Sequence, residues 1–478
     1  MKPKYIGRDR LSKVPKSEGD SIESLIQSGL QLLQKGRLRE SAQIYKYVLT
    51  RNPKNYKALN FLGIISHLTG KSQLAIELIR KSIAIDQNYA EAYYNLGVVQ
   101  QEIGEFENAI QSFTKALSIN PDFVQAYNNL GVAQQEIGEF ENAIQSFTKA
   151  LLINPDFEAE SLNNIGIVLR QQNKIDHAIR FFKKALSINS SLHQAHNNLI
   201  FCQDFMPNIS LIDQQKEREK WNHNFILPLS SKCRPHTNER NPDKKLSIGY
   251  VSSDFKKHSA AIGFSDLILN YDSTRFQVYC YCGVERFKSD EITALFQNHN
   301  SIWRSVHRLK DIELVEQIRK DQIDILVDLS GHTAGNRLLT FGYKPAPIQV
   351  TGIGHAPSGL TTIDYRLTSK LQTFFHEEIL FPEQPIYLSY TMGFHLHQTE
   401  VDLSPLPSYK NGFLTFGYLN RWDKISPEIL SIWIELMRTI PDSRLILKGG
   451  KMTDKNIGVS ILSQMKKGGI SEERIDLR

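Results

Sequence analysis

The first half of the chain repeats with a period of about 34 residues, and a period of this length strongly limits what the chain can fold into. Regularly spaced glycines mark it, with one extra position before the last of them: Gly29, Gly63, Gly97, Gly131 and Gly166. The stretch QQEIGEFENAIQSFTKAL that begins at Gln100 returns unchanged at Gln134. A unit of this length cannot bury a core by itself, so such units stack on their neighbours into an array.

The third repeat shows why the unit should be a pair of helices. Gly97 lies in the first helix, where the missing side chain lets the partner helix approach closely. Gly104 ends that helix. Phe113 and Ala116 then share one face of the second helix, and Pro121 stops it. This pattern is typical of the tetratricopeptide repeat.

We count five repeats, at residues 22–55, 56–89, 90–123, 124–157 and 159–192. A further helix at 193–206 is expected to cap the stack, so that the array covers residues 21–206 behind a disordered lead at 1–20. Stacked hairpins form a superhelix with a concave groove, which favours a peptide or protein ligand. A structural spacer is the alternative interpretation.

Asparagines recur on the predicted first helices with the same constant spacing: Asn95, Asn129, Asn163 and Asn197. A polar residue repeated on one helix face should line one side of the superhelix. An amide offers both a donor and an acceptor, which suits an extended peptide backbone of any sequence. We predict a row of groove asparagines, with solvent-facing polar residues as the alternative.

The second half of the chain alternates strands and helices. Strands are predicted at 246–251, 276–282 and 323–329, with a short one in APIQVTGIG, and helices at 286–298 and 311–320. This order predicts a doubly wound parallel sheet at residues 245–405, after a linker with a helix at 207–244.

A second α/β unit is expected at 406–478. GFLTFGYLN and SRLILKGG read as strands, with a helix between them and another at about 455–467. RIDLR begins a third strand, so this unit is predicted to be incomplete.

Composition excludes several classes of function. The net charge of +6 is too dilute for a nucleic-acid binder, although it suits a phosphate-bearing ligand. Four cysteines without paired CxxC spacing do not predict a zinc site, and as reduced thiols they fit the cytoplasm. No apolar run is long enough to span a bilayer, and no secretory signal is evident.

Polar side chains follow two predicted strands of the larger sheet. His258 comes after the first strand, where an imidazole can act as a base or bond to a sugar or phosphate; a surface histidine is the alternative. His332, Thr333 and Arg337 follow the strand at 323–329, between Gly331 and other turn residues. A guanidinium suits phosphate, but a turn with a capped helix would use the same residues.

Arg421 and Lys424 follow the first strand of the last unit, just before a predicted helix. Two cations at a helix N-terminus form a candidate diphosphate site. A solvated loop, with Asp423 as the counter-charge, is the alternative.

Several motifs in this order resemble one family. The array is followed by LSIGYVSSDFKKH, DLSGHTAGNRL, PAPIQV, IDYRLTS and FGYLNRWDKISPEIL. Together they are similar to the O-linked N-acetylglucosamine transferases, and most closely to bacterial and plant members of the SPINDLY type. The resemblance implies an inverting GT-B glycosyltransferase with two Rossmann-like lobes. Such an enzyme moves a sugar from a nucleotide diphosphate to Ser or Thr hydroxyls of proteins.

The resemblance also implies roles for residues. His258 matches the active-site histidine, Arg337 a basic residue of the catalytic cleft, and Lys424 the lysine that contacts the donor diphosphate. With His332, the first two are our catalytic candidates; Arg421, Lys424 and Thr333 are the donor-binding candidates. The donor is expected to be UDP-GlcNAc, with no metal and no other cofactor, because cationic side chains neutralise the leaving diphosphate.

The chain also departs from the family pattern. Arg421 stands where the animal enzymes have glutamine, and some SPINDLY-type members transfer fucose, so the donor sugar stays open. A loop of the GYPGT type is replaced by GHAPSGL, with His355 for tyrosine. The family's second lobe also continues well beyond the motifs seen here. An inactive, truncated scaffold is therefore the alternative function, and a second chain that completes the lobe is a further partner candidate.

Overall fold

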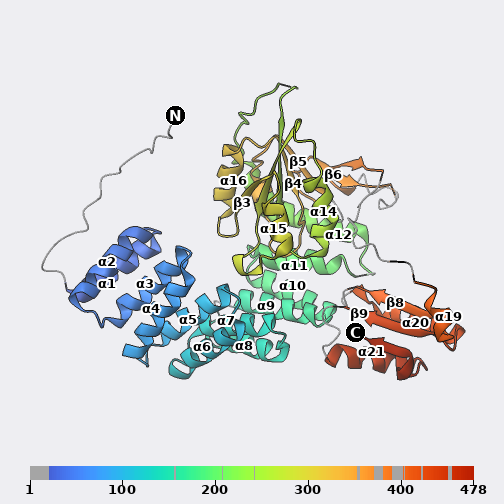
Figure 1. The fold of residues 1–478 in the computed structure, drawn as a ribbon, viewed down its shortest axis with the longest axis horizontal. Helices are drawn as coiled ribbons and strands as arrows, with labels where there is room; N and C mark the ends of the chain where they lie inside the picture. The colour runs from blue at the N-terminus through green and yellow to red at the C-terminus, as the bar shows by residue number, and fades with distance from the viewer. Residues whose placement is uncertain are drawn as a thin grey trace. The chain divides into compact units, whose positions relative to one another are not determined.

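The computed structural model describes residues 21–155, 158–206, 208–241, 243–352, 356–370, 380–389, 402, 404–420, 424–449 and 455–478. The chain divides between residues 157 and 158 into two compact units. The fold is drawn in Figure 1. A helical array continues into an α/β domain, as the sequence predicts.

The first unit consists of helical hairpins stacked in chain order. Their helices are α1 (Ile22–Gln34), α2 (Leu38–Arg51), α3 (Tyr56–Leu68), α4 (Ser72–Ile85), α5 (Ala90–Glu102), α6 (Phe106–Ile119), α7 (Val124–Glu136) and α8 (Phe140–Ile153). A Cβ atom added to Gly97 would lie 2.6 Å from the ring of Phe113. Phe113 is fully buried, so the glycine is what allows the two helices of this hairpin to touch.

The second unit begins with the fifth hairpin, formed by α9 (Glu158–Gln171) and α10 (Ile175–Ile188). The cap predicted at 193–206 is α11 (His193–Gln203), which packs on α10. Gly166 lies against the Phe182 ring, just as Gly97 lies against Phe113. The helices therefore follow the predicted repeat boundaries to within a few residues.

The predicted linker at 207–244 is packed structure instead. It contains α12 (Leu211–Trp221), a π-helical turn (Asn222–Ile226) and α13 (Leu227–Ser230). Trp221 and Ile226 are fully buried in the same core as Leu326 of the sheet. Beyond α13, Asn238 donates from Nδ2 to the carbonyl oxygen of Ile323 at 3.0 Å. The stretch has few apolar residues, but Trp221 and Ile226 enter the core, so the linker prediction was wrong.

The larger sheet is parallel throughout, in the strand order β3-β2-β1-β4-β5-β6-β7. Its strands are β1 (Leu246–Ser252), β2 (Phe276–Cys282), β3 (Ile302–Ser305), β4 (Ile325–Asp328), β5 (Ile348–Gly352), β6 (Tyr365–Thr368) and β7 (Gln384–Tyr387). Its helices are α14 (Ser259–Leu269), α15 (Glu291–Gln297), α16 (Asp311–Lys320) and α17 (Leu338–Gly342). The sequence did not predict β3, β6 or β7.

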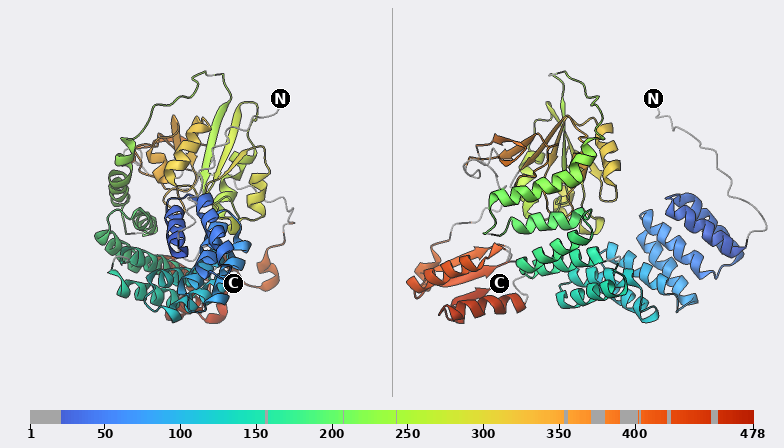
Figure 2. Two further views of the ribbon diagram at one scale, coloured as in Figure 1. Left: turned by 90° about the vertical axis from the view of Figure 1, so that its left-hand side faces the viewer. Right: turned by 180° about the vertical axis from the view of Figure 1, so that it is seen from behind.

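Both faces of this sheet are buried, as a parallel sheet requires. Along β1, Tyr250 belongs to the core that contains Phe264 of α14, whereas its neighbour Val251 belongs to the core that contains Trp221. Helices therefore lie on both sides of the strands (Figure 2). This packing leaves the loops at the strand ends as the places for polar function.

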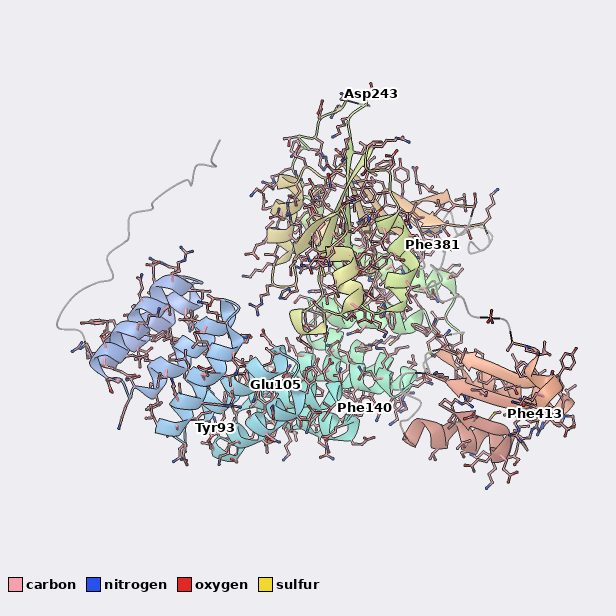
Figure 3. All side chains as sticks on the ribbon, in the orientation of Figure 1. Tyr93, Glu105, Phe140, Asp243, Phe381 and Phe413 are labelled. Atoms are coloured by element: carbon pink, nitrogen blue, oxygen red, sulfur yellow. The ribbon has the colours of Figure 1, made fainter. Side chains whose placement is uncertain are left out.

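The last part of the chain forms a smaller parallel sheet of three described strands, in the order β10-β9-β8. Its elements are α19 (Pro407–Asn411), β8 (Thr415–Leu419), α20 (Pro427–Thr439), β9 (Arg444–Lys448), α21 (Lys455–Lys467) and β10 (Ile475–Leu477). Met437 of α20 and Met465 of α21 pack with Leu447 of β9. Phe413, labelled in Figure 3, stacks under the guanidinium of Arg444, 4.3 Å from the ring centroid. Each predicted element of this unit is present.

Candidate functional site

The strand order places a topological switch point between β1 and β4. The chain winds outward through β2 and β3 on one side, and through β5, β6 and β7 on the other. In such sheets, ligands bind outside the carboxyl ends of the strands at the switch point. The loop after β1 carries His258, and the loop after β4 carries His332, Thr333 and Arg337. The sequence candidates of the larger sheet thus come from the two loops that flank this point.

The two loops touch each other. Ser253, after β1, donates from Oγ to the carbonyl oxygen of Ala334, after β4, at 3.1 Å. Gly335 has φ +76°, and a Cβ there would lie 2.8 Å from Oγ of Ser253. Only glycine satisfies both conditions, so Gly335 lets the loops meet. Ser253 was missed as a site residue, although a serine at the end of a buried strand is a usable signal.

His258 is the N-cap of α14. Its Nδ1 accepts the backbone N–H of Ala260 at 3.2 Å, and lies 3.8 Å from Oδ1 of Asp254. The side chain is 43% exposed, so the ring can be reached by a ligand. With Nδ1 accepting, the proton of the neutral imidazole is on Nε2, which is then a hydrogen-bond donor. The geometry favours bonding to a sugar or phosphate oxygen over proton abstraction by Nε2.

The His258 loop is held in place by α15. Asp290 accepts the Lys257 N–H at 2.6 Å with Oδ2 and caps α15 with Oδ1. Thr293 donates from Oγ1 to the carbonyl oxygen of Phe255 at 2.7 Å. Burial alone would raise the pKa of the Asp290 carboxyl, but the bonds from Lys257 and Thr293 outweigh it and lower that pKa. Asp290 and Thr293 therefore fix the loop, a role that the sequence analysis did not assign.

Arg337 does not present a free guanidinium. Its Nη2 donates to the carbonyl oxygen of Val306 at 2.9 Å and to that of Leu309, and its Nη1 to Oδ1 of Asp311 at 3.3 Å. Only 19% of the side chain is exposed. In this structure the guanidinium secures the β4 loop to the segment between β3 and α16.

Thr333 and its neighbours form a tight turn. The Thr333 hydroxyl donates to the carbonyl oxygen of Ser330 at 2.7 Å. Asp328, 1% exposed, accepts the N–H groups of Ser330 and Gly331 and the hydroxyl of Thr351. A buried carboxylate with three donors stabilises one loop shape. Asp328 was also missed, because Thr351 lies in a different strand.

His332 is placed differently from our expectation of a catalytic group. It is 7% exposed, and both ring nitrogens are engaged: Nδ1 lies 2.7 Å from Oδ1 of Asn197 and Nε2 lies 2.8 Å from the carbonyl oxygen of Ser358. Burial lowers the pKa of His332 to about 3, with a smaller contribution from the nearby charge of Arg218. The ring is neutral and enclosed, so it cannot exchange protons with a substrate.

Lys424 is exposed, as a ligand-binding cation should be. It lies two residues before Ser426, whose hydroxyl caps α20 by accepting the Ile429 N–H at 3.3 Å. A lysine beside a helix N-terminus suits a phosphate. Arg421 and His355 lie outside the described residues.

Two of the predicted groove asparagines join consecutive first helices. Asn95 donates from Nδ2 to Oδ1 of Asn60 at 3.1 Å, and Asn129 donates from Nδ2 to the hydroxyl of Tyr94 at 3.1 Å. Both are half-buried, so part of each amide stays accessible.

The other two do not share this position. The glycine of the fifth repeat, Gly166, comes one position later than the period predicts, so the constant spacing of the asparagines slips by one along the helix. Asn163 and Asn197 are buried at 7% and 6% exposure. The half-buried position is taken by Asn164 and Asn198 instead. In the second unit, therefore, Asn164 and Asn198 replace Asn163 and Asn197 as the half-buried asparagines.

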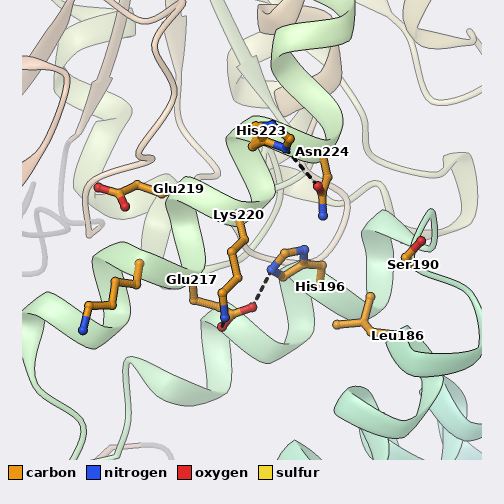
Figure 4. A pocket seen from close by; sticks show the side chains of 9 residues that line it. Leu186, Ser190, His196, Glu217, Glu219, Lys220, His223 and Asn224 are labelled. Atoms are coloured by element: carbon orange, nitrogen blue, oxygen red, sulfur yellow. Dashed lines mark hydrogen bonds and ion pairs between the residues drawn. The ribbon is translucent and has the colours of Figure 1, made fainter.

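One pocket of about 620 Å³ lies between α10, α11, α12 and the π-helical turn (Figure 4). His196 and Glu217 are paired inside it at 2.8 Å, and Lys220 donates to the same carboxylate at 3.1 Å. The bond from His196 is the main reason that the pKa of Glu217 is lowered. None of the predicted site residues lines this pocket, and its opposite charges balance, so it identifies no ligand.

Neither a metal centre nor a membrane-spanning helix is found among the described residues. There, no three His, Cys, Asp or Glu side chains are grouped so as to hold a metal ion. Within the same residues, no helix is long and apolar enough to cross a membrane.

The described fold is an array of helical hairpins followed by a doubly wound domain with polar loops at its switch point. Residues 226–402 match the model of Glycosyl transferase family 41, and residues 27–90, 90–123 and 122–191 match models of the tetratricopeptide repeat. The helical hairpins thus match the tetratricopeptide repeat, and the doubly wound domain is similar to Glycosyl transferase family 41.

Several named proteins are similar to this chain. A probable UDP-N-acetylglucosamine–peptide N-acetylglucosaminyltransferase SPINDLY of Arabidopsis thaliana is 32% identical over 252 residues, 50% of this chain and 27% of the relative. Its Oryza sativa counterpart is 34% identical over 275 residues, covering 55% and 29%. The chain therefore spans less than a third of these relatives. A solved Thermobaculum terrenum O-GlcNAc transferase mutant superposes with a TM-score of 0.74 at 28% identity, over 81% of this chain and 74% of that one.

Proposed function

We propose that this chain belongs to a protein O-glycosyltransferase, which transfers a sugar from a nucleotide diphosphate to Ser and Thr hydroxyls. The observation that carries the proposal is the pair of touching loops at the β1–β4 switch point of a family 41 domain. UDP-GlcNAc is the proposed donor, because the similar plant proteins are named for it. The free thiols of all four cysteines support a cytoplasmic location.

The described residues support distinct roles in this reaction. His258, with Nδ1 accepting from Ala260, has an Nε2–H donor for an oxygen of the donor sugar or the leaving diphosphate. Lys424, with Arg421, supplies positive charge for the diphosphate, so that no metal is required. Arg337 acts by holding the β4 loop, since three of its five N–H groups already bond to Val306, Leu309 and Asp311.

The array is proposed to hold the acceptor protein. Asn95 and Asn129 use one amide hydrogen within the array, which leaves the other amide positions for a peptide backbone. Asn164 and Asn198 are the corresponding candidates of the second unit. The match of the second half to a glycosyltransferase family favours this function over a scaffold.

Labelling of a mixed protein extract tests the proposal. The purified protein is incubated with UDP-GlcNAc labelled in the sugar, and in parallel with labelled GDP-fucose. We expect sugar from UDP-GlcNAc on Ser and Thr, released by β-elimination. If only the reaction with GDP-fucose labels protein, the donor is GDP-fucose and not UDP-GlcNAc. Peptide binding without transfer from either donor would favour the scaffold.

A further inference from the structure

We propose that the last helix of the array positions the loops at the switch point, with Asn197 and Arg218 as positioning residues. The structural part of this inference stands alone, whereas its consequence for catalysis rests on the proposed transferase function. All the residues involved lie in the second compact unit.

The first link joins α11 to the β4 loop. Asn197 and His332 are 135 positions apart in sequence, yet their side chains meet at 2.7 Å in a buried environment. The edge of the His332 ring also packs on Trp221 of α12, with the ring centroids 5.2 Å apart. The Ser358 carbonyl can only accept, so Nε2 carries the one N–H of the neutral ring. Nδ1 must then accept, which requires the Asn197 amide to be turned so that Nδ2, in place of Oδ1, lies at the 2.7 Å contact.

The second link joins the end of the array to the loop after β5. Arg218 of α12 is 1% exposed and binds both carboxylate oxygens of Asp204 through Nη2, each at 2.7 Å. Its Nε donates to the carbonyl oxygen of Pro357 at 2.9 Å. A Cβ on Gly359 would lie 2.6 Å from the Cβ of Arg218, so this loop lies directly on α12.

A third contact joins the loop after β5 to the π-helical turn. Thr361 donates its backbone N–H to Oδ1 of Asn222 at 3.1 Å. The Ser358 carbonyl, which His332 binds, belongs to the same loop. The loops after β4 and β5 are thus bonded to each other through His332, to α11 and α12 through Asn197 and Arg218, and to the π-helical turn through Asn222.

Such a buried and paired network specifies one geometry, because each broken bond leaves a polar group buried without a partner. In the proposed enzyme, the array that binds the acceptor would then set the loops that meet the donor. Asn197 and His332 touch no substrate in this account. They act through the position of the loop that carries Thr333 and Arg337.

Hydrogen exchange tests the link without requiring any transfer activity. Asn197→Ala is compared with Asn198→Ala, a matched control whose amide bonds to Asn163 inside the array at 3.0 Å. We expect Asn197→Ala to speed exchange at residues 330–337 at least about tenfold, while the amides of β2 stay protected. Asn198→Ala should leave residues 330–337 unchanged. Equal effects of the two variants, or no effect of Asn197→Ala, would overturn the proposal.

Two additions keep the outcome decisive. If Asn197→Ala does not fold, Asn197→Leu keeps a side chain of similar size and removes both amide groups, so the same comparison applies. In the transfer reaction, Asn197→Ala should lower kcat about tenfold and leave KM for the nucleotide sugar unchanged. Fast exchange with no transfer by the unmodified protein would retain the link and refute the transferase function.

Discussion

Nδ1 of His258 accepts the backbone N–H of Ala260 at 3.2 Å, so one side chain both caps α14 and offers an imidazole at the switch point. These two roles can be separated. Asparagine is among the best N-cap residues and has no imidazole, whereas alanine provides neither.

We predict that His258→Asn folds with unchanged stability but loses transfer by about 100-fold or more, the scale expected for a lost group at the reacting centre. His258→Ala should lose transfer equally and also about 1 kcal/mol of stability, because the cap is gone. Thermal denaturation measures the stability of the two variants, and initial rates measure their transfer activity. Transfer by His258→Asn at the original rate would show that the imidazole is only a cap.

Removing the Arg337 guanidinium should reduce stability as well as transfer. The carbonyl groups of Val306 and Leu309 and the carboxylate of Asp311 would each lose one donor. We expect Arg337→Ala to cost about 1–3 kcal/mol in urea denaturation. Arg337→Lys keeps the charge but not the fork of donors, so its stability should lie between those of the parent and Arg337→Ala. An Arg337→Ala variant as stable as the parent would contradict the positioning role.

Close packing of Gly97 on Phe113 predicts a specific coupling. Gly97→Ala should destabilise the array by about 1–3 kcal/mol, because the new methyl group meets a buried ring. Phe113→Leu makes room, so the double variant should be less damaged than the sum of the two. A double-mutant cycle, with the free energies of unfolding measured in urea, gives the coupling energy between the two positions. Strictly additive losses would mean that the ring does not define the contact.

Acid should weaken the second unit partly through His332. Its pKa is about 3 when folded and about 6.5 when unfolded, because burial and the charges of Arg218 and His196 disfavour the imidazolium. Below about pH 6.5 the His332 imidazole is therefore protonated in the unfolded chain but stays neutral in the folded chain. The free energy of unfolding consequently falls as the pH drops toward 3.

Between pH 7 and 5 this residue should account for about 2 kcal/mol of lost stability. Urea denaturation at both pH values, compared between the parent and His332→Gln, isolates it from other titrating groups. Trp221, next to the ring, reports the transition by fluorescence. Identical losses in the two proteins would mean that His332 titrates normally.

The sequence predicted the fold where its signals are local. The regular period of the first half determines the hairpins, and apolar runs reveal β1, β2 and β4. The strands β3 and β6 were missed because each is short and carries an arginine, Arg304 or Arg366. Arg304 pairs with Asp321, a carboxylate from beyond the next helix, which no local pattern can show.

In the candidate site, too, only the features with local sequence signals were predicted. His258 and the β4 loop were found because residues after buried parallel strands meet at one sheet edge. The detailed roles of these residues were not predicted, because they depend on partners far away in the sequence. The Asn197 side chain contacts His332, and the Val306 carbonyl accepts from Arg337. The added residue of the fifth repeat is visible in the glycine spacing, but the resulting burial of Asn163 was seen only in the structure.

The most direct test of the central claim is the mass of a Ser- and Thr-containing acceptor peptide after incubation with the protein and UDP-GlcNAc. The account predicts an added N-acetylhexosamine on a hydroxyl side chain, formed by the parent and not by His258→Asn. An unmodified peptide with the parent protein, across acceptors that bind the array and with either nucleotide sugar, would contradict it.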